Sequence, residues 1–98
     1  MIFPEGLSSI EEFEKVSKEL KEYSPKTYLL ANMTEFGKTP IIDFEEFGKV
    51  GYNIVIYPVS TLRIAMKAVE DFLGLLQKEG NVSGSLDKMQ TREDLYDV

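Results

Sequence analysis

Three short apolar runs, each followed by a helical pattern, constrain the fold of this chain more than any other feature. They cover residues 1–5, 27–33 and 53–58, and the third is rich in β-branched side chains. Short continuous apolar runs are typical of strands that are buried on both faces, as in parallel sheets. Because helical patterns separate the runs, the sequence predicts an α/β fold with parallel strands and right-handed crossovers.

The helices are predicted from apolar side chains that recur at steps of three and four residues. We expect them at residues 9–23, 43–50, 60–79 and 91–97, with a polar loop at 81–85. Either Ser8 or Ser9 can begin the first helix, because each is followed three residues later by a glutamate, the spacing of a capping box. Asp43, Ser60 and Thr91 are the expected caps of the later helices.

The length of the chain limits how these elements can close on themselves. Its 98 residues are enough for one small domain. Three strand–helix units are too few for a closed barrel of eight, which needs about 250 residues. Three parallel strands also leave two open sheet edges, and open edges invite pairing with another chain. Both a small free-standing α/β layer and a piece of a larger domain fit this pattern.

The composition excludes several classes of function. The formal net charge of -6 repels phosphate backbones, so we expect no nucleic-acid partner. No apolar stretch reaches the roughly 18 residues of a spanning helix, and residues 1–7 lack the basic start of a signal peptide, so we expect a cytoplasmic protein with no membrane partner. Cys and His are both absent, so acid–base chemistry would fall to Asp, Glu, Lys or Tyr.

A candidate ligand site lies where the predicted strands end, because ligands of parallel sheets gather at the carboxyl ends of the strands. Glu5 ends the first run, residues 32–34 end the second, and Arg63 lies early in the helix after the third. A guanidinium can hold a carboxylate through two parallel hydrogen bonds, so this set suits a small polar or anionic ligand. Each side chain could instead be a turn former or a solvated surface group. No metal-ligand cluster, phosphate-binding glycine loop or nucleophile–base pair is present.

Four ordered segments carry a more specific signal. They are residues 1–5 (MIFPE), residues 30–40 (LANMTEFGKTP), Tyr57-Pro58 followed by Ser60 and Arg63, and residues 87–96 (DKMQTREDLY). Together they resemble the C-terminal part of the 2-methylisocitrate lyases, within the isocitrate lyase/phosphoenolpyruvate mutase family. The resemblance covers nearly the whole chain, and a single PE or TEFG would not carry it.

The resemblance implies a fold beyond what the residues alone indicate. The chain would be the last three strand–helix units of a TIM-type (β/α)8 barrel. In this family the helix after the eighth strand commonly swaps between neighbouring subunits, so residues 62–76 are expected to mediate a homo-oligomer. The other expected partner is the N-terminal part of the barrel, which the chain does not contain.

The resemblance also implies roles for individual residues. The position of Glu5 would contact the substrate or the hydration shell of a Mg²⁺ ion, and the remaining positions would bind substrate carboxylates: Asn32, Met33 and Thr34 on the part that leaves as succinate, together with Arg63 and Arg92. The implied reaction is a retro-aldol cleavage of 2-methylisocitrate, a tricarboxylate, to pyruvate and succinate. Mg²⁺ is the implied cofactor, since it stabilises the developing enolate.

The absent residues bear on activity. In the family, the acidic Mg²⁺ ligands and a Lys-Lys-Cys-Gly-His type loop with the catalytic cysteine lie on earlier strands, and this sequence has no Cys or His. We therefore expect no catalytic residue and no metal ligand in this chain, and no turnover by the chain alone. Two alternatives stay open: a member of the phosphoenolpyruvate mutase or carboxyphosphonoenolpyruvate phosphonomutase type, and a non-catalytic, self-associating fragment.

Overall fold

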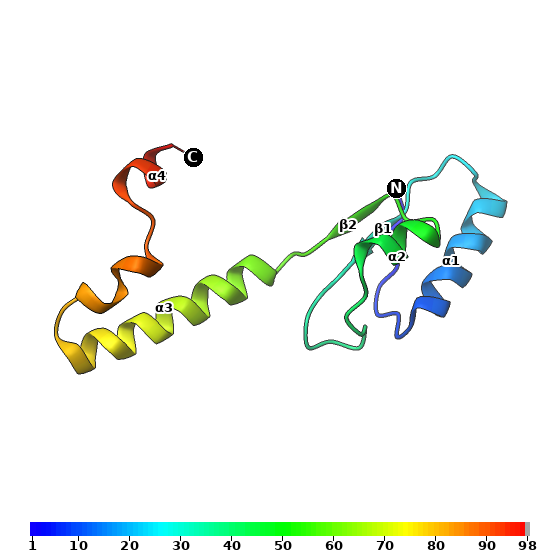
Figure 1. Ribbon diagram of the computed structural model, residues 1–98. Coiled ribbons are helices and arrows are strands. Elements are labelled where there is room, and N and C mark those ends of the chain that lie inside the picture. Colours follow the sequence, from blue (N-terminus) through cyan, green and yellow to red (C-terminus); the bar gives the residue numbers. More distant parts are fainter. Residues whose placement is uncertain (98) are drawn as a thin grey trace. The chain divides into compact units, whose positions relative to one another are not determined.

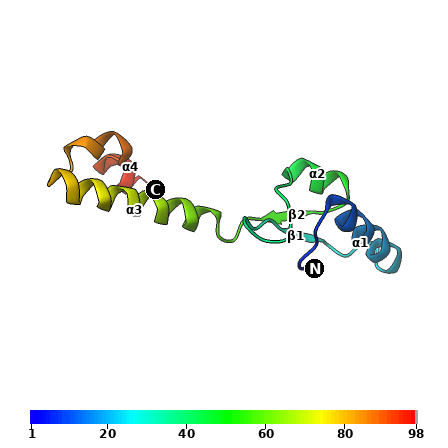
Figure 2. The same ribbon diagram turned by 90° about the horizontal axis from the view of Figure 1, so that it is seen from below.

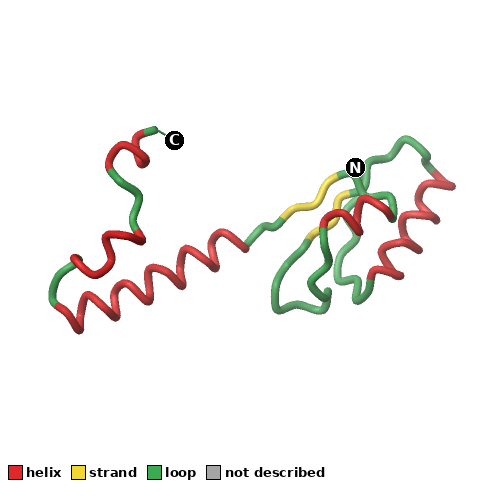
Figure 3. Tube along the Cα trace, in the orientation of Figure 1, coloured by secondary structure: helices red, strands yellow, loops and turns green. Residues whose placement is uncertain are grey.

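The computed structural model describes residues 1–97, which divide into two compact units, Met1–Leu62 and a second unit that begins at Arg63. Figures 1 and 3 show helices alternating with short strands, the order expected for an α/β chain. The elements are α1 (Ile10–Tyr23), β1 (Leu30–Asn32), α2 (Phe44–Lys49), β2 (Ile54–Ile56), α3 (Ser60–Glu79), the 3₁₀ helix η1 (Ser83–Lys88) and α4 (Arg92–Tyr96).

The two strands of the first unit are parallel neighbours, as the sequence predicts (Figure 2). Leu30 pairs with Ile54, and Asn32 pairs with Ile56. On its other side β1 meets the N-terminal segment, because the Leu30 N–H donates to the carbonyl of Ile2 over 2.9 Å. β1 is therefore the central member of a three-segment parallel arrangement.

The prediction of a strand over residues 1–5 is wrong. The structure gives this segment only one bridge, between Ile2 and Leu29. In a parallel ladder every second residue of a strand bonds to the same neighbour. After Ile2 the next donor would therefore be Pro4, which has no N–H. Gly6 then turns the chain with a φ of 69°, a conformation that glycine adopts at low cost.

The core of the first unit lies between α1, α2 and one face of β1. Phe13, Phe47 and Tyr52 pack edge to face, with ring centroids 4.9 to 5.9 Å apart, and the Tyr52 hydroxyl donates to the Phe13 carbonyl at 3.0 Å. The other buried apolar side chains are Leu29, Ala31, Met33 and Ile42. Because side chains alternate along a strand, β1 turns Asn32 to the face opposite Ala31 and Met33.

The helix ends test the predicted caps. Ser9 caps α1, since its hydroxyl accepts from the Glu12 N–H, and the Glu12 carboxylate accepts in return from the Ser8 N–H at 2.6 Å. The Thr91 hydroxyl likewise accepts from the Asp94 N–H at the start of α4. The other two expected caps form no such bond.

Asp43 is the residue before α2, as predicted, but its side chain forms no hydrogen bond with the first turn of the helix. The predicted side-chain cap is therefore wrong. Ser60 is the first residue of α3, and its hydroxyl donates to the Glu35 carboxylate instead. The expected loop at 81–85 is also partly wrong, because η1 begins at Ser83, where the Asn81 side chain accepts from the Ser83 N–H at 3.0 Å. That local bond replaces the open loop with a helical turn.

The second unit contains helices but little burial. None of the residues of α3 is buried, and the predicted apolar stripe is open to solvent, with Met66 59% and Leu73 54% exposed. Ser85 of η1 is the one buried side chain among the described residues after Arg63. A shallow apolar groove in this unit is lined mainly by Ala68, Val69, Phe72, Leu75 and Met89. No helix among residues 1–97 is long and apolar enough to cross a membrane.

Candidate functional site

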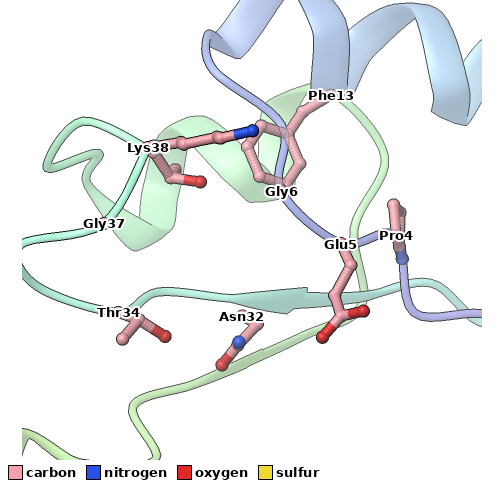
Figure 4. A pocket seen from close by; sticks show the side chains of 9 residues that line it. Pro4, Glu5, Gly6, Phe13, Asn32, Thr34, Gly37 and Lys38 are labelled. Atoms are coloured by element: carbon pink, nitrogen blue, oxygen red, sulfur yellow. The ribbon is translucent and has the colours of Figure 1, made fainter.

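A pocket of about 410 Å³ lies in the first unit at the carboxyl end of β1 (Figure 4). Its walls come from the segment after the Ile2 bridge, from α1, from the end of β1 and from the loop that follows. The lining residues are Pro4, Glu5, Gly6, Phe13, Asn32, Thr34, Gly37, Lys38 and Thr39. The parallel pairing places the first and third of these segments beside each other, although 26 positions of sequence separate Gly6 from Asn32.

Asn32 and Thr34 reach the pocket because they alternate with the buried core residues of the same segment. Both are half-buried. The Asn32 amide oxygen is fully buried, and no hydrogen-bond partner for it occurs among residues 1–97. A buried polar atom without a partner costs free energy, so this oxygen would gain a hydrogen bond if the Asn32 side chain turned toward a donor in the pocket.

The loop after β1 folds back over the pocket. Phe36 has a φ of 63°, the left-handed region that non-glycine residues seldom occupy, and this turn reverses the chain. Thr39 then ties the loop to the opposite wall, because its hydroxyl donates to the Leu7 carbonyl at 2.5 Å. These two features hold Lys38 at the edge of the pocket, where Figure 4 shows its side chain extending from the loop toward Phe13 and Gly6.

The pocket therefore carries one side chain of each charge. Glu5 contributes a carboxylate and Lys38 an ammonium, and both residues are solvent-exposed. Thr34 adds a hydroxyl, and Asn32 adds an amide with donors and an acceptor. Sequence reasoning missed Lys38, although one signal was available: it is the only basic residue between Lys26 and Lys49, and it lies in the loop after a buried strand.

A second bond supports the same loop from outside the pocket. The carboxylate of Glu35 accepts from the hydroxyl of Ser60, which lies in the first turn of α3 and within the first unit. The loop after β1 and the connection after β2 are thereby joined. Because both lie at the carboxyl ends of parallel strands, this bond holds together the sheet edge at which parallel sheets commonly bind ligands.

Comparison with known proteins gives a consistent result. No family profile matches the sequence. The chain is 47% identical over all of its 98 residues to the 2-methylisocitrate lyase of Aeropyrum pernix, and 46% identical over 97 residues to that of Bacillus subtilis. Its structure matches the crystal structure of 2,3-dimethylmalate lyase, a member of the same superfamily, with a TM-score of 0.81 at 33% identity over 96% of the chain. The chain belongs to the phosphoenolpyruvate mutase/isocitrate lyase family.

The match confirms the resemblance inferred from the four sequence segments, including its position in the C-terminal portion of the family. The chain spans about a third of its relatives: 30% of the Aeropyrum pernix protein, 31% of the Bacillus subtilis protein and 31% of the 2,3-dimethylmalate lyase chain. Its structure is α/β with parallel strands, in agreement with the predicted fold class.

The structure brings together three of the six residues expected to bind substrate in this family. Glu5, Asn32 and Thr34 line one pocket. Met33 instead places its side chain in the core, 2% exposed, and its N–H donates to the Ile56 carbonyl at 2.9 Å. A contact between Met33 and substrate stays a prediction.

The two arginines belong to the second unit. Arg63 is in α3 and Arg92 is the first residue of α4. Their expected contacts with substrate carboxylates also stay predictions.

A Mg²⁺ ion, which the family is expected to use, requires a group of oxygen ligands. Among residues 1–97, no three acidic or other metal-ligating side chains are grouped as a metal site requires. Glu5 is the one carboxylate that lines the pocket. Mg²⁺ is normally held by one or two carboxylates together with waters and substrate oxygens. Glu5 could supply one ligand at most, so the remaining carboxylate ligands of a Mg²⁺ ion would have to come from outside residues 1–97.

Proposed function

We propose that this chain forms the carboxylate-binding side of a carbon–carbon lyase that cleaves 2-methylisocitrate to pyruvate and succinate. The main support is the buried Asn32 oxygen in a pocket that also holds Thr34 and Lys38. A hydroxylated polycarboxylate supplies what these groups need, since its hydroxyl can donate to Asn32 while its carboxylates accept from Thr34 and Lys38. Identity to 2-methylisocitrate lyases over the whole chain favours this substrate within the family.

The reaction requires groups that this chain does not have. In the retro-aldol step a base takes the substrate's hydroxyl proton, a C=O bond forms as the C–C bond breaks, and the electron pair left on succinate takes up a proton. The side chains around the pocket bind and orient the substrate, which lowers the entropic barrier to that step. The family's cysteine loop and Mg²⁺ ligands would come from the part of the barrel outside this chain, so we propose that the chain alone gives no turnover.

The exposed sheet face supports the proposed barrel. Ile54 and Ile56 lie 40% and 37% exposed, whereas Val55 between them packs against the core. In a TIM-type barrel the inward face of every strand is covered by side chains from the other strands. We propose that this face is completed by the first five strand–helix units, and that the site works in the cytoplasm as part of that barrel.

The exposed stripe of α3 supports a second partner. A 20-residue helix with Leu62, Met66 and Leu73 open to solvent gains free energy when another apolar surface covers it. We propose that a second copy provides this surface through exchange of the helix between subunits. The same stripe favours the alternative of a self-associating fragment without a ligand, which differs from the lyase proposal in predicting no binding at the pocket.

The experiment is a titration of the 98-residue chain with succinate, followed by NMR. We expect binding on the order of millimolar, with amide shifts concentrated at Asn32 and Thr34. Asn32→Asp adds a negative charge in the pocket and should weaken succinate at least about tenfold. Asn81→Asp makes the same change in the second unit and keeps the oxygen that accepts from Ser83, so it should bind as the unaltered chain does.

A coupled assay for pyruvate on the purified chain with 2-methylisocitrate and Mg²⁺ tests the other half of the proposal. We expect no pyruvate above background. Turnover by these residues alone would overturn the proposed division of labour, and absence of any succinate shift at Asn32 or Thr34 would overturn the proposed binding site.

A further inference from the structure

Among residues 1–97, Lys38 is the one cationic side chain that lines the pocket at the end of β1. The other charged group there is Glu5, which repels any carboxylate that enters. Without Lys38 the lining would be neutral and acidic, a poor environment for an anion. The net charge of -6 for the chain as a whole adds to the repulsion. A carboxylate ligand in this pocket therefore depends on a local positive charge.

The loop conformation holds Lys38 where that charge is needed. The hydroxyl bond from Thr39 to the Leu7 carbonyl fixes the residue immediately after Lys38 to the opposite wall. The left-handed turn at Phe36, two residues before Lys38, directs the chain back over the pocket. Lys38 is thus fixed by its backbone on both sides, while its side chain remains exposed and free of any role in the core.

We propose that Lys38 determines the preference of this pocket for dicarboxylates over monocarboxylates. A ligand with two carboxylates places one against Asn32 and Thr34 at the end of β1 and the second against the Lys38 ammonium, which Figure 4 shows near Phe13 and Gly6. A monocarboxylate satisfies only the first set and leaves Lys38 in water. The inference deepens the proposed function and rests on it, because it assigns the selectivity of the same site to a residue of the loop.

The test compares succinate with butyrate, which has the same number of carbons and only one carboxylate. Binding of each to the 98-residue chain is measured from the amide shifts of Asn32 and Thr34 at constant ionic strength. Lys38→Gln should weaken succinate about 1.5- to fivefold, the range for a solvent-exposed charge pair, and leave butyrate unchanged. Lys38→Arg keeps the charge and should keep most of the preference. Lys26→Gln, at an exposed lysine that does not line the pocket, is the matched control.

The outcomes separate the role of Lys38 in selectivity from the existence of the carboxylate site. Selective weakening of succinate by Lys38→Gln and its absence in Lys26→Gln support the inference. Equal weakening of succinate and butyrate assigns Lys38 only to the shape of the loop and overturns it, as does unchanged binding of both. In those cases the carboxylate site still stands. No binding of succinate to the unaltered chain removes the site itself and, with it, both proposals.

Discussion

The two units of this chain are built from similarly regular helices, yet they differ sharply in what those helices bury. In Met1–Leu62 the helices cover a parallel strand pair and enclose an aromatic cluster of Phe13, Phe47 and Tyr52. In the part that begins at Arg63, the described residues bury no apolar side chain, although α3 is the longest helix. Periodicity in sequence therefore establishes that a helix has an apolar face, but it does not establish what covers that face.

The largest expected difference in the free energy of unfolding comes from replacing a leucine by alanine in each of the two units. Leu29→Ala removes a side chain that is fully buried and should lower the free energy of unfolding by about 2–5 kcal/mol. Leu73→Ala removes one that is 54% exposed and should change it by less than about 0.5 kcal/mol. Urea denaturation followed by circular dichroism measures both at low micromolar concentration.

The comparison between the leucines also reports on self-association. A loss of stability for Leu73→Ala as large as that for Leu29→Ala would show that the α3 face is covered in solution and that the two units do not differ in burial. If that loss grows with protein concentration, a second copy provides the cover, as the proposed helix exchange requires.

Glycine substitutions should have opposite signs in the two units. Gly51 has a φ of 102°, and a Cβ there would lie 2.4 Å from the hydroxyl oxygen of the buried Ser17, so Gly51→Ala should cost about 1–3 kcal/mol. Gly74 lies inside α3 with no atom near its Cβ position, so Gly74→Ala should stabilise the helix by up to about 1 kcal/mol. Thermal melts of the two variants measure the difference. A stable Gly51→Ala variant would mean that the turn after α2 is less constrained than its contacts with α1 indicate.

The smallest expected effect is a dependence on pH that arises in the first unit. Burial raises the pKa of Tyr52 to about 12, above the ordinary value of 10.0, because the phenolate would be desolvated. The folded state therefore holds this proton more tightly than the unfolded state. The stabilisation is complete below pH 10 and is lost as the pH rises toward 12, by roughly 2 kcal/mol.

Denaturation curves between pH 9 and 12 measure this loss. Tyr52→Phe should be less stable below pH 10, since it lacks the bond to the Phe13 carbonyl, but its stability should fall less with pH. Tyr28→Phe, at a side chain 63% exposed, should follow the unaltered chain. Identical slopes for all three proteins would show that Tyr52 is not desolvated as its position in the core indicates.

Most of the fold could be predicted because its signals are local. The cap at Ser9 and the apolar spacing of α1 depend on residues within a few positions of each other. Strand extents could not be predicted in the same way. The run 27–33 forms only three residues of strand, Leu30–Asn32, because hydrogen-bonded neighbours, rather than apolar character, define where a strand ends.

The residues of the candidate site likewise differ in whether a local sequence signal predicts them. Asn32 and Thr34 were predictable because the end of a parallel strand is a known ligand position. Lys38 had only the weak signal of a lone basic residue in the loop after a strand, because its position depends on the turn at Phe36 and on the bond from Thr39 to Leu7. That bond spans 32 positions of sequence, and no local pattern announces it.

The tie between Thr39 and Leu7 also makes ligand binding and folding a single equilibrium. Both walls of the pocket exist only while the chain around Ile2 is paired with β1, so an unfolded molecule offers no partial site. By mass action, a dicarboxylate at 100 times its dissociation constant would add about 2.7 kcal/mol to the stability of the first unit. A bound dicarboxylate would therefore act as a structural component of the first unit as well as its ligand, although at a concentration equal to its dissociation constant it would add only about 0.4 kcal/mol.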